Sequence, residues 1–155
     1  MKKRKDYNPS ILKKEKIKIK KSISIDKFIK LKKIKKDIGI LVKIDTEGSE
    51  KLVIDGMKKI LKSKNISGYF EYSSGWKNFN YKLKGVFYLL KKNKFTIFRI
   101  TKNGLILMRY FSELDENYFQ SHYFFVKENF FKKFRMKKGK ITSLTSDKKE
   151  LFYYI

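Results

Sequence analysis

The chain has 155 residues, enough for one domain with a buried core, and carries 40 Lys or Arg against 15 Asp or Glu, a formal net charge of +25. It contains no cysteine, which excludes disulfides, a thiolate nucleophile and cysteine zinc sites, and which agrees with a cytoplasmic location. No apolar run approaches the roughly 20 residues that a membrane span needs. The basic residues 1–21 also lack the apolar block of a secretory signal.

The positive charge is concentrated towards both ends of the chain and has two interpretations. A basic surface attracts nucleic acid or anionic membranes. However, 36 of the 40 basic residues are lysine, alanine is absent, and Ile, Lys, Asn, Phe and Tyr are abundant together, which is typical of AT-rich codon usage. The composition therefore favours codon bias, and a basic nucleic-acid-binding or accessory module stays as the alternative function, with Trp76, Phe79 and Tyr81 for base stacking.

The first part of the chain predicts one helix ahead of the first buried strand. Residues 1–21 alternate lysine with a few aliphatic residues, which predicts either an edge strand or a disordered segment. Residues 22–36 ("SISIDKFIKLKKIKK") predict a short strand followed by a helix, with Asp26 as the N-cap.

Two units follow in which a strand precedes a helix. Strands are predicted over residues 38–44 and 66–72, and helices over residues 49–65 and 81–93. The first strand is almost entirely aliphatic, as expected of a parallel strand that is covered on both faces. Ser49 is a candidate N-cap, and Asn93 suits a left-handed stop at the end of the second helix.

Three further strands close the predicted fold. Residues 94–101 and 104–110 predict a hairpin, because Asn103-Gly104 is a strong turn signal, and residues 121–127 predict the last strand. Residues 128–140 predict a basic helix whose three phenylalanines pack on the body or bind a membrane surface. The order predicts an α/β fold: half of a doubly wound sheet, parallel where strands and helices alternate and mixed or antiparallel at its C-terminal edge.

Acidic side chains gather where the two predicted parallel strands end. Asp45, Glu47 and Glu50 follow the first strand, with Gly48 among them, and Glu71 ends the second strand. Because parallel strands end at the same rim of a sheet, Asp45 and Glu71 are expected to lie close together. Glu47 and Glu50 have a second interpretation, in which they cap the next helix and offset the surrounding lysines.

The segment "LVKIDTEGSEKLVIDGMKKIL" resembles the signature of the FkbM-type methyltransferases, in which a strand ends in a K-I-D-x-E-G-x-E pattern and leads into an apolar helix. The positions that fit this pattern are Lys43, Ile44, Asp45, Glu47, Gly48, Glu50 and Gly56. The similarity continues upstream in "SISIDKFI" and downstream in "YFEYSSGW", "LLKKNKFTIFRI" and "GLILMRYFSELDENYFQSHYFFV", so that it covers about residues 22–127.

The resemblance implies a Rossmann-like, S-adenosylmethionine-dependent methyltransferase that acts on hydroxyl groups of sugars or other metabolites. Ligands of such sheets bind outside the carboxyl ends of the strands. Methyl transfer needs alignment of donor and acceptor and a base for the hydroxyl. Asp45 is the first candidate base and Glu71 the second, while Glu47, Gly48, Glu50 and His122 are rim residues that bind substrate or support the structure. No metal site is predicted, because a D-x-E pair alone is weak evidence.

The cofactor-binding half of the family is expected ahead of the matched region, with a glycine-rich turn at a helix N-terminus. No two of the eight glycines are close enough for a G-x-G pattern, and residues 1–21 are too few for two strand–helix units. The sequence therefore predicts three parts: a basic segment (1–21), the C-terminal half of a methyltransferase domain (22–127) and a basic tail (128–155). A truncated chain, or a partner chain or second copy that supplies the cofactor half, would explain this pattern.

Overall fold

The computed structural model describes residues 22–35, 38–127, 137–140 and 151–154. Its helices are α1 (Ile25–Leu31), α2 (Glu50–Asp55) and α3 (Leu83–Lys92), and its short 3-10 helices are η2 (Ile60–Lys62), η3 (Ser74–Phe79) and η4 (Glu113–Asp115). Its strands are β1 (Ile40–Ile44), β2 (Ile66–Tyr72), β3 (Phe95–Thr101), β4 (Gly104–Leu107), β5 (Ser121–Lys127), β6 (Lys137–Lys140) and β7 (Leu151–Tyr154). None of the helices in these segments is long and apolar enough to cross a membrane.

The strands form one mixed sheet in the order β1-β2-β5-β3-β4-β7-β6. The prediction of parallel strand pairing is confirmed for β1 and β2, whereas the other paired strands of the described residues are antiparallel. The last predicted strand, β5, lies between β2 and β3 and is antiparallel to both. This placement differs from the expectation of antiparallel pairing at the far edge alone, because sequence periodicity does not reveal which strands become neighbours.

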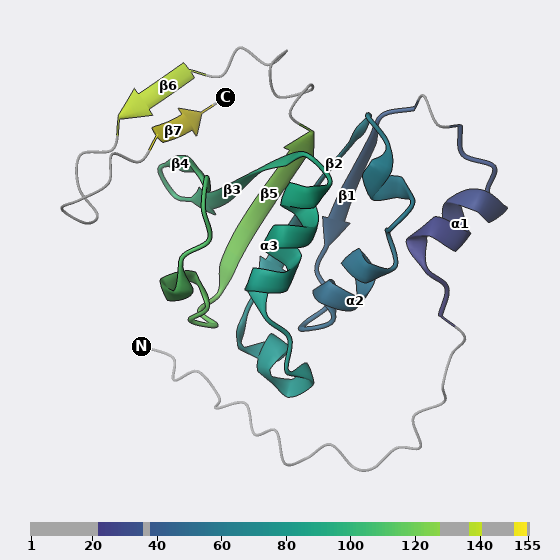
Figure 1. The fold of residues 1–155 in the computed structure, drawn as a ribbon, viewed down its shortest axis with the longest axis horizontal. Helices are drawn as coiled ribbons and strands as arrows, with labels where there is room; N and C mark the ends of the chain where they lie inside the picture. The colour runs from purple at the N-terminus through teal and green to yellow at the C-terminus, as the bar shows by residue number, and fades with distance from the viewer. Residues whose placement is uncertain (1–21, 36–37, 128–136, 141–150, 155) are drawn as a thin grey trace, which may run out of the picture.

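All three α-helices lie on one face of the sheet, so that the fold has two layers (Figure 1). Alternate residues of β2, such as Ile66 and Phe70, are buried on this face, and the intervening residues are only partly buried. The core combines these strand residues with apolar positions of α2 and α3, including Ile54, Val86 and Leu90. A smaller cluster around Phe98 and Val126 lies on the opposite face.

The structure corrects the predicted first helix and first strand. α1 begins at Ile25, and Ser24 is its N-cap, because the Ser24 hydroxyl accepts from the amide of Lys27 at 3.2 Å. The predicted strand before α1 is absent among the described residues. β1 is covered on one face only, since Leu41 is 74 % exposed, and its outer edge has no partner strand in the described part of the chain.

Other predicted boundaries also change. The helix predicted over residues 49–65 divides into α2 and η2, because the chain turns after Asp55. Asn93 ends α3 with φ −90°, and the next residue, Lys94, adopts the left-handed conformation at φ 60°. Residues 137–140 of the predicted tail helix form β6, and its three phenylalanines lie outside the described residues. The hairpin at Asn103-Gly104 is confirmed by antiparallel pairing of β3 and β4.

Candidate functional site: the carboxyl rim of β1, β2 and β5

The parallel pairing of β1 and β2 brings the predicted acids to one rim of the sheet. Ile44 is in register with Phe70, so the next residues, Asp45 and Glu71, stand at the same level. β5 extends the row, because His122 pairs directly with Glu71. Neighbouring strands are about 4.8 Å apart. The side chains of this row project from the face opposite Phe70, away from the helices.

Asp45 is held by a lysine of its own strand. The Lys43 ammonium lies 3.2 Å from the Asp45 carboxylate, and the Asp45 side chain is 33 % exposed. The hydrogen bond to Asp45 raises the pKa of Lys43. Lys43 also lies 6.0 Å from the ring centre of Tyr69. The Asp45 carboxylate is thus oriented by a cation and still reachable from solvent.

Glu71 and His122 are partly buried next to Asp45 in this row. The Glu71 carboxylate accepts from the side-chain amide of Gln120 at 3.2 Å. The His122 ring lies 5.8 Å from the ring of Tyr69. Its Nδ1 atom is buried and has no hydrogen-bond partner among the described residues. The rim therefore presents two carboxylates, and the His122 ring lies beside Glu71 with its Nδ1 atom enclosed.

Glu50 binds the backbone of the loop that follows β1. Its side chain is 1 % exposed. Its carboxylate accepts from the backbone amide of Thr46 at 2.7 Å and from that of Gly48 at 3.0 Å. Glu50 therefore holds the loop in place from the first residue of α2, whereas Glu47 is exposed and adopts the left-handed conformation at φ 54°.

Gly48 lies where the loops after β1 and β2 touch. It adopts φ +112°, and a Cβ atom at this position would lie 2.8 Å from the backbone of Gly75. A side chain is therefore excluded at Gly48 by conformation and by space. The contact fixes the two strand ends relative to each other and hence the spacing of the rim residues.

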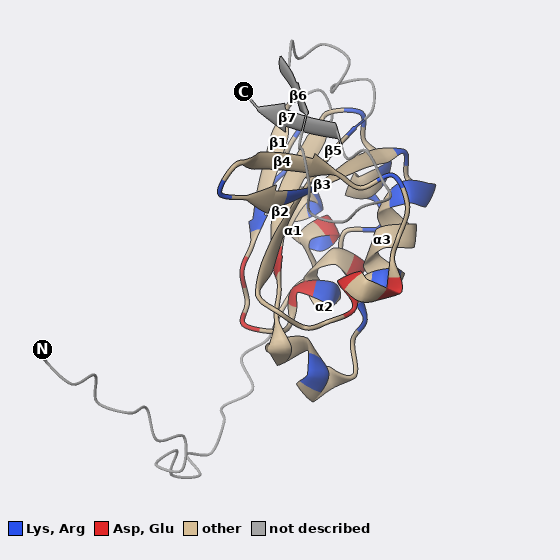
Figure 2. Ribbon diagram, turned by 90° about the vertical axis from the view of Figure 1, so that its left-hand side faces the viewer, with Lys and Arg blue, Asp and Glu red and all other residues tan. Residues whose placement is uncertain are grey.

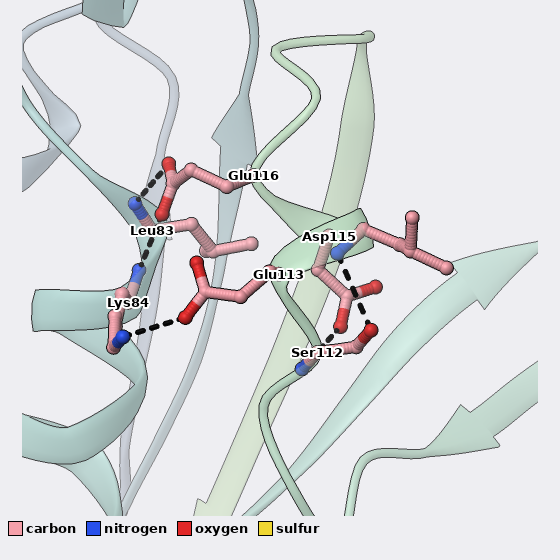
Figure 3. A network of polar contacts seen from close by, with 7 residues as sticks. Leu83, Lys84, Ser112, Glu113, Asp115 and Glu116 are labelled. Atoms are coloured by element: carbon pink, nitrogen blue, oxygen red, sulfur yellow. Dashed lines mark hydrogen bonds and ion pairs between the residues drawn. The ribbon is translucent and has the colours of Figure 1, made fainter.

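A further acid supports the rim and was missed in the sequence. Glu116 caps α3, because its carboxylate accepts from the backbone amides of Leu83 at 2.9 Å and Lys84 at 3.1 Å (Figure 3). The same carboxylate accepts from the Tyr72 hydroxyl at 2.8 Å. Burial and this hydrogen bond raise the pKa of Tyr72. The cap comes from 32 residues further along the chain, so a search for local capping residues could not find it.

The exposed groups of the described rim include carboxylates, which are hydrogen-bond acceptors. Carboxylates accept hydrogen bonds from hydroxyl groups. An anion at a strand end would need free backbone N–H groups, but Glu50 already occupies those of Thr46 and Gly48. The amides of Thr46 and Gly48 are therefore not offered to a cofactor carboxylate at this loop. Among them, no three His, Asp or Glu side chains lie close enough to hold a metal ion.

The aromatic residues considered for base stacking differ in their exposure. Trp76 is completely buried and packs edge-on against Tyr72, with ring centres 5.1 Å apart. Phe79 and Tyr81 stack on each other at 5.5 Å, and Phe79 is 47 % exposed.

Comparison with family models gives one match, to the Methyltransferase FkbM domain, over residues 2–123. The chain belongs to the FkbM methyltransferase family. This FkbM match includes β1, β2 and the rim residues, and it begins 20 residues upstream of the resemblance noted from the sequence. No curated protein and no solved structure is significantly similar to the FkbM chain.

Proposed function

We propose that this FkbM chain catalyses S-adenosylmethionine-dependent methylation of a hydroxyl group on a sugar or another metabolite. The observation that carries the proposal is the row of Asp45 and Glu71 at the ends of two neighbouring parallel strands in a chain of this family. The same placement supports a Rossmann-like origin of the sheet, because such folds bind ligands outside the carboxyl ends of parallel strands.

Asp45 is the proposed base. A hydroxyl group is a poor nucleophile until its proton has a place to go, and a positioned carboxylate can accept that proton. Asp45 is partly exposed at the rim, and Lys43 orients its carboxylate at 3.2 Å. Glu71, one strand away, would accept a hydrogen bond from a second hydroxyl of the acceptor, beside the one it accepts from Gln120. His122 lies in the same row and pairs with Glu71 from β5, where it supports the rim.

We propose that the contacts to the methyl donor come from outside the described residues. S-adenosylmethionine would supply the methyl group, while the residues at the rim bind the acceptor and take its proton. The outer edge of β1 has no partner among the described strands, and a parallel strand from a partner chain or a second copy could pair there. A cytoplasmic location stays a prediction from the absence of cysteine.

The proposal is tested by the variant Asp45→Asn in an assay that follows transfer of a labelled methyl group from S-adenosylmethionine to hydroxylated acceptors. Loss of the base is expected to lower kcat by about 100-fold or more, with a small change in KM. Asp55→Asn is the matched control, because Asp55 is a partly exposed acid on α2 that pairs only with Lys51 among the described residues. An Asp45→Asn enzyme that keeps more than half of the control's kcat would exclude Asp45 as the base.

A further inference from the structure

Two neighbouring cavities lie at the opposite end of the sheet, where β2 and β3 begin and β5 ends. One has a volume of about 360 Å³ and is lined by Lys62, Ser63, Lys64, Lys92, Asn93, Lys94 and Lys127. The other has a volume of about 790 Å³ and is lined by Asp26, Ile29, Lys30, Lys33, Ile34, Lys35, Ile40, Lys59, Ile60, Lys62, Ser63, Lys64 and Asn65. Residues 62–64 line both cavities, so the two adjoin at this segment and are together called the groove.

The groove is strongly basic. Nine different lysines line it, against one carboxylate, Asp26. That carboxylate is already engaged, because it accepts from the backbone amides of Lys59 at 2.7 Å and Ile60 at 2.9 Å. The other described acids line neither cavity, and blue segments gather at the end of α3 that lies away from α2 (Figure 2). The groove therefore favours an anion.

Lys127 lines the smaller cavity and offsets the negative ends of two carbonyl groups there. A helix C-terminus ends in carbonyl groups that repel anions. The Lys127 ammonium donates to the carbonyl oxygens of Leu61 at 2.6 Å and Asn93 at 2.5 Å, where η2 and α3 end. These carbonyl groups are thus covered by a cation. The four other lysines of this cavity are exposed, so that they can contact a ligand.

The larger cavity adds an aliphatic surface. Ile29, Ile34, Ile40 and Ile60 contribute to its lining. No aromatic side chain lines either cavity, which argues against single-stranded nucleic acid, because its binding sites use aromatic rings for base stacking. Free phosphate would leave the isoleucines in contact with water. Isoleucines in one cavity and lysines in both instead match a molecule that has an aliphatic chain and an anionic head group.

We propose that the groove binds a phospholipid, with its phosphate among the lysines of the smaller cavity and its acyl chain on the isoleucines of the larger one. The lysines attract the charged phosphate, and burial of aliphatic surface favours contact between the acyl chain and the isoleucines. Residues 62–64, shared by both cavities, lie where head and chain meet. The site is separate from the carboxyl rim and does not depend on methyl transfer.

The test uses dodecyl phosphate below its micelle concentration as the probe, titrated calorimetrically into the full chain at physiological salt. Binding with one-to-one stoichiometry is expected, accompanied by NMR shifts of the methyl groups of Ile29, Ile34 and Ile40 but not of Ile97, a residue of the core. Lys62→Glu/Lys64→Glu is expected to weaken binding by about tenfold or more, since two favourable charges become unfavourable.

The control variant is Lys82→Glu/Lys102→Glu, which changes the net charge equally at exposed lysines outside both cavities. It should change the affinity less than twofold. Equal weakening by both variants would show non-specific charge attraction and overturn the proposal. Inorganic phosphate that binds as tightly as dodecyl phosphate would overturn it too, as would binding only to vesicles of phosphatidylcholine with phosphatidylglycerol. Methyl shifts confined to core isoleucines would overturn it independently of any variant.

Discussion

At the scale of single residues, the rim depends on side chains that do not touch the proposed acceptor. Glu50 is buried and accepts two backbone hydrogen bonds from the loop after β1, and Glu116 caps α3 from a distant part of the chain. Their roles differ from that of Asp45, which is reachable from solvent. The family signature contains both kinds of acid within six residues, and the sequence alone leaves their roles open.

Glu50→Ala is expected to lower the free energy of unfolding by about 2–4 kcal/mol, because the buried N–H group of Gly48 and the partly buried one of Thr46 lose their charged acceptor. The measurement is urea denaturation at pH 7. Glu113→Ala is the control, since the Glu113 side chain is 73 % exposed and its ion pair with Lys84 lies at the surface; its removal should cost less than about 1 kcal/mol. Equal losses in the two variants would mean that Glu50 does not hold the loop.

At the scale of elements, the sequence predicts local structure better than it predicts long-range contacts. The strand predicted over residues 66–72 is confirmed as β2, and the hairpin predicted at the Asn103-Gly104 turn is confirmed as the pairing of β3 with β4. By contrast, the insertion of β5 between β2 and β3 depends on pairing between residues about 50 positions apart, which no local pattern encodes. The end of α2 after six residues was missed for a similar reason, because apolar spacing continues through η2.

The contact between the loops after β1 and β2 gives a prediction at this scale. Gly48→Ala is expected to destabilise the fold by about 2–4 kcal/mol, since it adds a strained backbone conformation and a clash with Gly75. Gly39→Ala, in the segment before β1, is the control, because its Cβ would meet nothing within 4 Å. The control should be neutral or up to about 1 kcal/mol more stable. Chemical denaturation of both variants measures the two free energies of unfolding. A Gly48→Ala protein as stable as the control would contradict the close loop contact.

At the scale of the whole molecule, the sheet is covered by helices on one face, and β1 leaves an edge open in the described part of the chain (Figure 1). Leu41 projects from this edge strand and is 74 % exposed. An exposed edge with an apolar side chain favours pairing with another strand. This geometry agrees with the proposal that a partner chain or second copy completes the methyltransferase site.

Leu41→Lys is expected to reduce association through β1 while it changes the free energy of unfolding by less than about 0.5 kcal/mol, because Leu41 is already exposed. Sedimentation velocity over a range of concentrations measures the association. Tyr110→Lys is the control, since Tyr110 is 84 % exposed and lies outside β1. If wild type and both variants sediment as monomers at every concentration, the edge of β1 does not mediate self-association.

The most direct test of the proposed methyltransferase function is a thermal-shift titration of the full chain with S-adenosylhomocysteine at physiological salt, beside ATP as a charge control. At a hundredfold excess over the dissociation constant, a specific ligand adds about 2.7 kcal/mol to the stability of the folded state. This corresponds to a rise of about 5–10 °C in the midpoint for a chain of this size. We predict such a rise with S-adenosylhomocysteine and none with ATP. A cooperatively unfolding sample whose midpoint does not move, or moves equally with ATP, would contradict binding of the methyl donor by this chain or by copies of it.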